Sequence, residues 1–245
     1  MPVRLYLDAP LNEGALLTLP PEPSRHVQVL RMQPGDDLLI FNGHDDGVEW
    51  LAEVTRMGRQ DVDVRIGASQ TCHRELPRTV VLAVGMPANE RMDALVEKAT
   101  ELGARGMQPL QCARSVLKLS GERAEKRRAH WQGVAVAASE QSGRTRVPLI
   151  EPIRTIDAWL AALPAEPAPG EVRHVLSFAP DAVQVKDLPG DARHITFLSG
   201  PEGGLDPREE ALARQRGFIP LSLGPRVLRA DTAPLAALTL VGALG

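Results

Sequence analysis

The sequence has few cysteines and no apolar run long enough to cross a bilayer. Its two cysteines, Cys72 and Cys112, lie far apart among 245 residues and outside any CxxC motif. A disulfide framework or a thiolate metal site is therefore not expected. The N-terminus also lacks the apolar core of a signal peptide. We expect a cytoplasmic protein with reduced thiols.

The common nucleotide and hydrolase motifs are also missing. There is no G-x-x-x-x-G-K-[ST], and no G-x-G-x-x-G follows the first strand expected in the α/β part, which argues against P-loop ATPases and Rossmann dehydrogenases. The six histidines are scattered without H-E-x-x-H spacing, so no metal site is expected. A G-x-S-x-G elbow is absent too. These absences exclude the most familiar cofactor and hydrolase classes.

The charge balance describes a soluble globular protein. Hydrophobic residues make up 43% and charged residues 24% of the chain, which is not the composition of a disordered segment. The net charge of -3 argues against nonspecific coating of nucleic acid but permits a local basic face. Of the 28 basic residues, only four are lysines.

Residues 4–68 are predicted to form short strands joined by tight turns. Period-two alternation and turn residues indicate strands at 4–8, 36–41, 48–54 and 62–66, with a short helix at 24–31. Four or five short strands with one helix predict a small barrel, which protects its edges by closing. Residues 71–77 are expected to be a linker.

From residue 78 the pattern alternates between strands and helices, which predicts a mainly parallel sheet covered on both faces. Strands are expected at 79–84, 107–110, 172–178 and 195–198, and helices at 90–102, 121–141, 156–163 and 206–217. Asp206, Pro207 and Glu209 form a helix-start signal. The last segment, 231–244, is apolar nearly all round, so it is either sunk in its own core or shared with a partner.

Two glycine-rich loops follow predicted strands. They are Leu198-Ser-Gly-Pro-Glu-Gly-Gly204 and Ser222-Leu-Gly-Pro-Arg226, and their backbones are open to a ligand. Sharp turns in parallel folds also use Gly and Pro, so either loop alone has an equally good structural explanation. The polar segment Val227-Leu-Arg-Ala-Asp-Thr232, directly before the final apolar segment, favours a binding site.

Four ordered motifs together resemble one known family. They are Glu97-Lys-Ala-Thr-Glu-Leu-Gly103, Ser139-Glu-Gln-Ser-Gly-Arg144, the loop at 198–204 and the segment 222–233. This combination resembles the RsmE family, SPOUT-class methyltransferases that modify uridine N3 in 16S ribosomal RNA. The resemblance covers nearly the whole chain. One departure is that Ala88 and Asn89 stand where the family commonly has Lys-Gly.

The resemblance implies a fold, a cofactor and partners. The expected architecture is a PUA-like RNA-binding β-barrel at 1–71, then a SPOUT methyltransferase domain at 72–245 with a parallel sheet and a C-terminal trefoil knot. The cofactor would be S-adenosyl-L-methionine. The partners would be 16S rRNA or the small ribosomal subunit, and a second copy of the chain bound through the knotted domain. The matching cofactor positions are Leu198, Gly200, Pro201, Glu202, Gly203, Ser222, Leu223, Gly224, Leu228, Arg229 and Thr232.

Methylation at uridine N3 requires loss of a weakly acidic proton from a base edge that is paired in a duplex, so the base must be splayed out or single-stranded. A carboxylate can accept that proton, and an arginine can stabilise the uracil anion. Glu202 and Arg229 are the catalytic candidates, followed by Glu140. The competing interpretations are that Glu202 caps a loop amide and that Arg229 pairs with Asp231.

Basic residues in both parts are candidates for RNA phosphate contacts, although surface arginines are usually only solvated. They are Arg4, Arg25, His26, Arg31, Arg114, Lys118, Arg123 and Arg144. Two alternatives stay open at this point. The chain can be a non-catalytic RNA-binding ribosome-assembly factor on the same two domains, or a SPOUT methyltransferase acting on another RNA.

Overall fold

The computed structural model describes residues 2–44, 47–88 and 90–243. The chain divides into two compact units. The first comprises Met1–Glu75 with Ser139–Val147, and the second comprises Leu76–Ala138 with Pro148–Gly245. Residues 72–75 and 139–147 thus cluster with the first unit, and the domain boundary after residue 71 remains a prediction. Each unit is described separately below.

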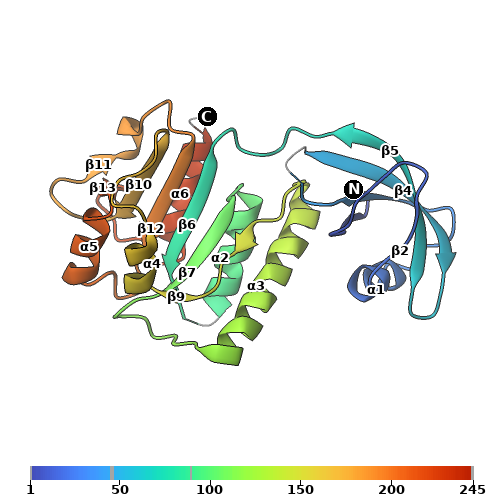
Figure 1. Cartoon of the computed structure of the whole chain (residues 1–245), viewed down its shortest axis with the longest axis horizontal. Helices are drawn as coiled ribbons and strands as arrows, with labels where there is room; N and C mark the ends of the chain where they lie inside the picture. Colours follow the sequence, from blue (N-terminus) through green and yellow to red (C-terminus); the bar gives the residue numbers. More distant parts are fainter. Residues whose placement is uncertain (1, 45–46, 89, 244–245) are drawn as a thin grey trace. The chain divides into compact units, whose positions relative to one another are not determined.

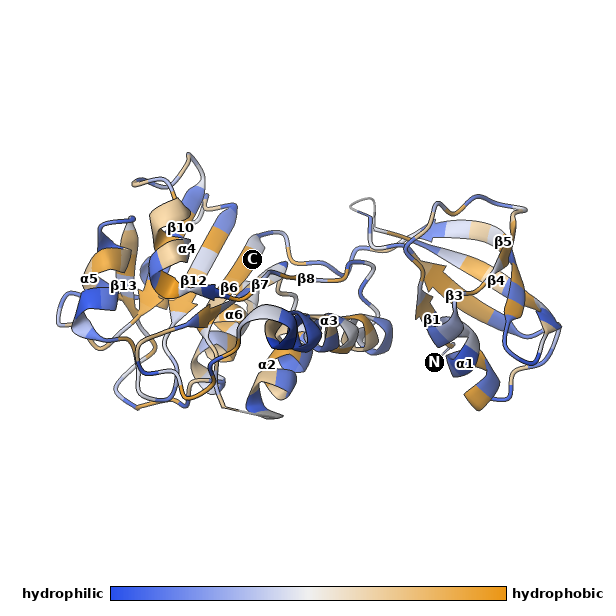
Figure 2. Cartoon of the chain, turned by 60° about the horizontal axis from the view of Figure 1, so that its bottom comes forward, coloured by the Kyte–Doolittle hydropathy of each residue, from blue (hydrophilic) through white to orange (hydrophobic). Residues whose placement is uncertain are grey.

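The first unit is built on a five-stranded sheet (Figure 1). Its strands run in the order β1 (Arg4–Tyr6), β3 (Asp37–Phe41), β4 (Val48–Met57), β5 (Val62–Thr71) and β2 (Leu16–Thr18), and α1 spans Pro21–Val29. Among the strands described in this sheet, β1 and β3 form the only parallel pair. Figure 2 shows hydrophobic and hydrophilic residues alternating along these strands, as expected where one face covers a core. The short β2 was not predicted, because three residues carry too little alternation.

A buried carboxylate organises one end of this unit. Glu49 is fully buried on β4, and its carboxylate accepts hydrogen bonds from Arg4 Nη2 at 2.8 Å, Arg74 Nη1 at 3.2 Å and Gln70 Nε2 at 2.7 Å. Arg4 also donates to the carbonyl oxygens of Ser139 and Arg144, both at 3.1 Å. The Glu49–Arg4 pair therefore holds segment 139–147 in the first unit.

These contacts decide the protonation of Glu49. Burial alone raises the pKa of Glu49, but hydrogen bonds from Cys72, Arg4, Arg74 and Gln70 outweigh it and lower the pKa to about 2. The folded pKa lies below the ordinary value of 4.5, so the carboxylate stabilises the fold above that pH. This contribution is lost as the pH falls towards 2.

We predict that Glu49→Gln lowers the free energy of unfolding by about 3 kcal/mol at pH 7, because Arg4 is left buried without its counter-charge. The loss should shrink as the pH falls from 4.5 towards 2, because in this range the unfolded wild-type chain takes up a proton at Glu49 more readily than the folded protein does. Denaturant unfolding at several pH values measures both effects. Glu53→Gln is the matched control, since Glu53 is exposed on the same strand. Equal pH dependence in the two variants would contradict the prediction.

The second unit contains a parallel sheet of eight strands (Figure 1). The order is β11 (Val183–Gln184), β13 (Phe218–Ser222), β10 (Glu171–Leu176), β12 (His194–Ser199), β6 (Thr79–Gly85), β7 (Gly106–Gln111) and β8 (Leu149–Ile150), with β9 (Arg154–Thr155) also paired to β7. Every pair in this sheet is parallel. The predicted parallel α/β architecture is confirmed.

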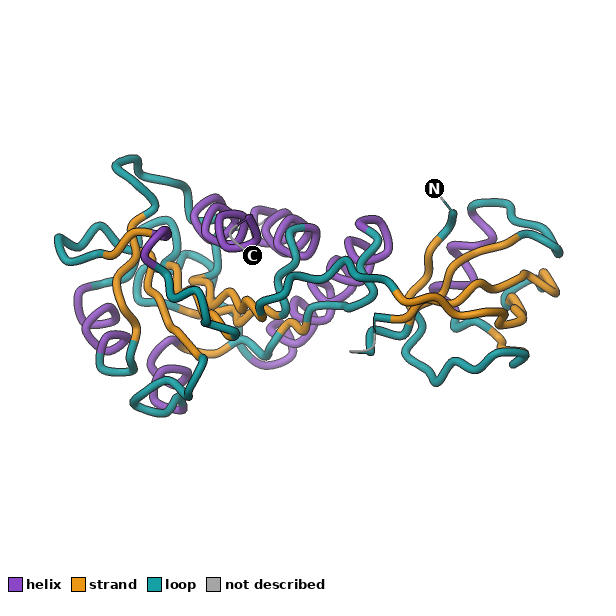
Figure 3. The backbone as a smooth tube through the Cα atoms, turned by 90° about the horizontal axis from the view of Figure 1, so that it is seen from above, coloured by secondary structure: helices purple, strands orange, loops and turns teal. Residues whose placement is uncertain are grey.

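Helices cover both faces of this sheet, as Figure 3 shows. On one face α4 (Ile156–Ala162) packs against α5 (Pro207–Arg214), and on the other α2 (Glu90–Glu101) packs against α6 (Thr232–Ala243). The remaining helical segments are α3 (Gly121–Ser142) and the short η1 (Val185–Asp187). In the described ranges, no helix is long and apolar enough to cross a membrane.

The helix start and stop signals predicted from the sequence are present in the structure. The Asp206 side chain accepts the Glu209 amide at 2.7 Å, and the Glu209 carboxylate accepts the Asp206 amide at 2.9 Å, which is the predicted capping box. Gly103, which follows α2, has a φ of 97°, a conformation that favours glycine. The capping box sets the start of α5, the helix that later anchors one wall of the site.

Helix α6 is the apolar C-terminal segment that was expected either to be buried in its own core or to be shared with a partner. Its inner face is buried through Pro234, Ala237, Leu238 and Val241, and it contacts β6 and β12. Leu240 on its outer side is 43% exposed. The helix therefore packs into its own core and still presents apolar surface.

Candidate functional site

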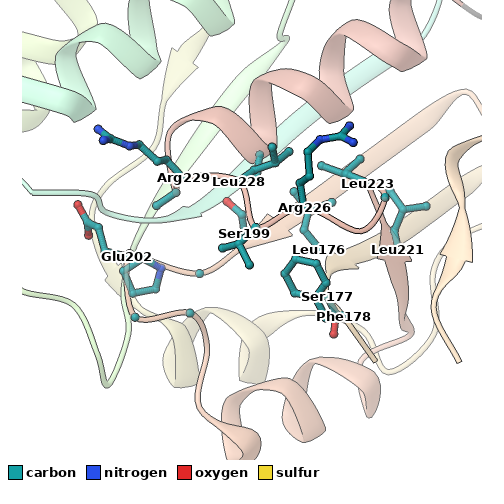
Figure 4. A pocket seen from close by; sticks show the side chains of 18 of the residues that line it. Leu176, Ser177, Phe178, Ser199, Glu202, Leu221, Leu223, Arg226, Leu228 and Arg229 are labelled. Carbon is teal, nitrogen blue, oxygen red and sulfur yellow. The ribbon is translucent and has the colours of Figure 1, made fainter. Parts of the chain in front are cut away.

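A cavity of about 570 Å³ opens at the carboxyl ends of β10, β12 and β13 (Figure 4). Because these strands are parallel neighbours, the loops that follow them emerge at one edge of the sheet. β10 lies between two strands that come later in the chain, so connections diverge on either side of it. Ligands of open α/β sheets bind at such a point. We call this space the carboxyl-edge cavity.

Five segments line the carboxyl-edge cavity. Arg91 comes from α2, and Leu176, Ser177 and Phe178 come from the end of β10. The next two groups are Ser199, Gly200, Pro201, Glu202, Gly203 and Gly204 at and after the end of β12, and Leu221, Leu223 and Gly224 around the end of β13. The last group is Arg226, Val227, Leu228, Arg229 and Ala230 before α6, with Ala233 in its first turn. The two glycine-rich loops and the polar segment before α6, which are separate in the sequence, thus meet at one site.

Most of the predicted cofactor residues lie at this cavity. The eight that line it are Gly200, Pro201, Glu202, Gly203, Leu223, Gly224, Leu228 and Arg229. The other three predicted cofactor residues do not line the cavity. Leu198 is fully buried in the core beside α4, Ser222 Oγ accepts the Gly224 amide at 3.2 Å, and Thr232 is the first residue of α6. Their positions shape the loops without lining the cavity.

Sequence reasoning missed the wall formed by Leu176, Ser177 and Phe178. These residues end the strand predicted at 172–178, so the signal was present as a strand terminus in a parallel fold. What the sequence does not show is that β10 pairs with both β12 and β13. Without that strand order, nothing in the sequence indicates that the end of β10 lies at the binding site.

Gly85 and Gly200 are glycines because a side chain at either position would collide with neighbouring atoms of the protein, not because a ligand needs the room. A Cβ on Gly85 would lie 2.5 Å from Pro201 Cδ and 2.6 Å from Pro201 N. A Cβ on Gly200 would lie 2.5 Å from the Leu205 amide nitrogen. The end of β6 and the loop 199–205 therefore touch backbone to backbone, which only glycine permits.

Glu202 ties this loop to the segment that follows β6. Its Oε1 accepts the Ala88 amide at 2.9 Å and lies 3.4 Å from Arg91 Nη1. The amide-cap interpretation of Glu202 thus holds for one oxygen. Within the described ranges, no hydrogen bond involves Oε2, and the side chain is 30% exposed. One oxygen positions the loop, and the other remains available.

Arg229 is exposed beside the cavity, on the same side as Glu202 (Figure 4). No ion pair joins it to Asp231 or to any other residue that the structure describes, so the alternative of an Arg229–Asp231 pair is not found. Ser199 Oγ is buried at the cavity without a hydrogen-bond partner among the described residues. A buried hydroxyl without a partner is costly, so a polar ligand group there would stabilise it.

Several other candidates have structural roles. Arg114 Nη1 donates to the carbonyl oxygens of Gly203 at 2.8 Å and Leu205 at 3.2 Å, so it braces the glycine-rich loop. Glu140 belongs to the first unit, where its Oε1 accepts the Tyr6 amide at 2.8 Å and burial raises its pKa. It does not line the carboxyl-edge cavity. Its catalytic role stays a prediction.

The RNA contacts predicted for Arg4 and Arg144 are not supported. Arg4 pairs with Glu49 and stacks 4.8 Å from the centre of the Phe41 ring, and its side chain is only 8% exposed. Arg144 is buried against Glu75. Their guanidinium groups are used inside the fold. The remaining basic candidates are exposed: Arg25, His26, Arg31, Lys118 and Arg123.

Fold and site together define an α/β enzyme of the methyltransferase class, with a separate small β unit. Residues 74–242 match the family model of the RNA methyltransferase domain, and residues 19–67 match that of the RNA methyltransferase PUA domain. The chain is 34% identical to ribosomal RNA small subunit methyltransferase E of Bacillus subtilis, over 94% of this chain and 91% of that protein. It belongs to this family, RsmE, which confirms the resemblance seen in the motifs.

Two solved structures of similar proteins also support membership of this family. The methyltransferase E of Neisseria gonorrhoeae bound to S-adenosyl methionine has a TM-score of 0.87 at 34% identity and covers 97% of this chain and 95% of that one. A putative methyltransferase of Legionella pneumophila in complex with the same cofactor has a TM-score of 0.91 at 33% identity, covering 99% and 98%. The likeness extends over both units.

We predict that Gly85→Ala destabilises the protein by about 2 kcal/mol, because the new methyl group must displace Pro201. The control is Gly133→Ala in the middle of α3, where a Cβ meets nothing within 4 Å. That change should stabilise the helix by about 1 kcal/mol, since alanine has the higher helix propensity. Thermal or denaturant unfolding measures both. Equal effects of the two substitutions would refute the close-contact explanation.

Proposed function

We propose that this protein uses S-adenosyl-L-methionine to methylate N3 of a specific uridine in 16S ribosomal RNA. The observation that carries the proposal is the carboxyl-edge cavity, built from the motifs shared with the family. Relatives named as small-subunit rRNA methyltransferases, and solved relatives bound to S-adenosyl methionine, support the cofactor and the substrate class. The choice of uridine N3 rests on the family.

The cavity suits this cofactor in size and chemistry. Its volume of about 570 Å³ lies in the range of small-molecule sites. Leucine side chains, including Leu176, Leu223 and Leu228, offer apolar cover for a purine. Arg91 supplies a positive charge for the carboxylate of the amino-acid group, and Ser199 Oγ offers an unused hydrogen bond. When bound, S-adenosylmethionine supplies an electrophilic methyl group.

The protein's own groups can handle the uridine proton. The free Oε2 of Glu202 can accept the N3 proton directly or through water, while Oε1 keeps the loop in place. Arg229, exposed on the same side of the cavity, can stabilise negative charge on O2 or O4 of the uracil. The base must be turned out of any helix for its N3 edge to reach these groups.

We expect Arg229→Ala to lower kcat about a hundredfold, because it removes the charge that stabilises the uracil anion. Glu202→Gln should lower kcat about as much, since the amide oxygen can still accept the Ala88 amide but cannot take up a proton. Single-turnover methylation of RNA at saturating cofactor measures both. If both variants keep wild-type turnover and ordinary cofactor affinity, these catalytic roles are wrong.

Exposed basic residues are the proposed RNA contacts. In the first unit, Arg25 and His26 lie on α1 and Arg31 follows it, and none forms an ion pair with a described residue. The match of residues 19–67 to a PUA domain model supports RNA binding by this region. In the second unit, Lys118 and Arg123 are exposed near the start of α3. Phosphate is the expected partner of such cations.

Arg25→Ala should weaken RNA binding and reduce the slope of log affinity against log salt by about one unit, as expected for one lost phosphate contact. Titrations of a 16S RNA fragment at several salt concentrations measure this slope. Lys126→Ala is the matched control, because Lys126 is exposed but already pairs with Glu122 at 2.7 Å. An unchanged slope for Arg25→Ala removes this face of α1 from the RNA interface.

A trefoil knot and a homodimer complete the proposal. The chain passes from β13, on one side of β10, back to α6 against β6 and β12, which is consistent with a threaded C-terminus. The exposed Leu240 on α6 offers apolar surface to a second copy. Light scattering of the wild type and of Leu240→Glu tests the dimer, which should dissociate in the variant.

The substrate is tested by mass spectrometry of 16S RNA from a strain that lacks this gene. We expect its N3-methyluridine to disappear and to return with the wild-type gene but not with Arg229→Ala. Persistence of the modified base would refute the substrate assignment. Calorimetry with S-adenosylmethionine separates the enzyme from an assembly factor, which would not bind the cofactor.

A further inference from the structure

Phe178 is a large apolar side chain left open to solvent at the carboxyl-edge cavity. It is 63% exposed, although it lines the cavity two residues beyond the end of β10. Figure 4 shows it on the same side as Leu221 and Leu223, opposite Glu202 and Arg229. An aromatic ring held at a cavity mouth offers a flat apolar surface to a flat ligand group.

The loop that carries Phe178 is anchored to α5. Ser177 Oγ donates to Glu210 Oε1 at 2.9 Å, and Glu210 pairs with Arg214 at 3.2 Å. Arg214 in turn binds both oxygens of Asp181, at 2.7 and 3.1 Å. Residues 177 and 181 are therefore both tied to one helix. This network holds the intervening Phe178 in place before a ligand arrives, which lowers the entropy lost on binding.

The charges of the cavity are divided between its two sides. Glu202 and Arg229 lie on one side, with Leu228 next to Arg229, and Leu221 and Leu223 lie with Phe178 on the other (Figure 4). Arg226 is also on the Phe178 side but is itself exposed to solvent. A zwitterionic amino-acid group is best placed on the charged side, which leaves the apolar side for the purine.

We propose that Phe178 covers the adenine ring of the bound cofactor, and that Ser177, Glu210, Arg214 and Asp181 act as positioning residues for it. The inference rests on the proposed use of S-adenosylmethionine and assigns one end of that ligand to one wall of the site. Phe178 then contributes to affinity for any ligand that contains the adenosyl group, whether or not the amino-acid part is present.

Calorimetry without RNA tests this with two ligands, S-adenosylhomocysteine and 5′-methylthioadenosine, the second of which lacks the amino-acid part. Phe178→Ala should weaken both by about five- to tenfold, the range of an aromatic contact, and Phe178→Trp should retain affinity. Arg214→Ala should weaken both by about threefold, because partly exposed ion pairs contribute modestly. Arg208→Ala is the matched control, since Arg208 on the same helix pairs with Asp157 on α4 and should change neither affinity.

The alternative is that Phe178 stacks against a base of the RNA. Unchanged affinity of Phe178→Ala for both ligands, with weaker RNA binding, would establish that alternative and overturn the inference. A loss confined to S-adenosylhomocysteine would also overturn it, because it would place the ring beside the amino-acid group. Failure of the wild type to bind either ligand would instead overturn the proposed function. Because Phe178 is exposed, its truncation should leave the thermal unfolding temperature unchanged.

Discussion

The site depends on two polypeptide segments that meet without side chains between them. The end of β6 and the loop after β12 approach so closely that a Cβ on Gly85 would collide with Pro201 and the Gly200 backbone, and a Cβ on Gly200 would collide with Gly204 and Leu205 in its own loop. Around this contact, Glu202 ties the loop to the Ala88 amide and Arg114 braces the Gly203 carbonyl. The loop is therefore fixed from several directions, and a fixed loop can present its backbone and charged groups to a ligand in one geometry.

Several arginines of this protein hold the fold together from buried positions. Arg4 and Arg144 are buried with carboxylates, and Arg173 on β10 pairs with Glu171 and donates to the carbonyl oxygens of Pro164 and Arg216. A guanidinium has five donors in a planar arrangement, so it can join several carbonyls and a carboxylate at once. These arginines are therefore engaged within the fold.

Close backbone packing and arginine ion pairs both contribute to the carboxyl-edge cavity. Its glycine-rich wall is built by close backbone packing, and its β10 wall is anchored by the ion pairs of α5. One side presents Glu202 and Arg229, and the other presents Phe178 with Leu221 and Leu223. In the arrangement that we propose, the first side takes the amino-acid end of the cofactor and the second side takes the purine.

The sequence by itself determined the parallel α/β architecture, the capping box of α5 and the family, because periodicity, helix caps and ordered motifs are local properties of the chain. Only the tertiary structure decided that the end of β10 forms a wall of the cavity, that one oxygen of Glu202 caps Ala88, and that Arg4 and Arg144 lie inside the fold. Each of these depends on partners distant in the sequence: Leu176 meets Leu221 through strand order, and Arg4 meets Glu49 through sheet register. Local patterns indicate which face of an element is buried, but the identity of the residue it meets is set by the packing of the whole chain.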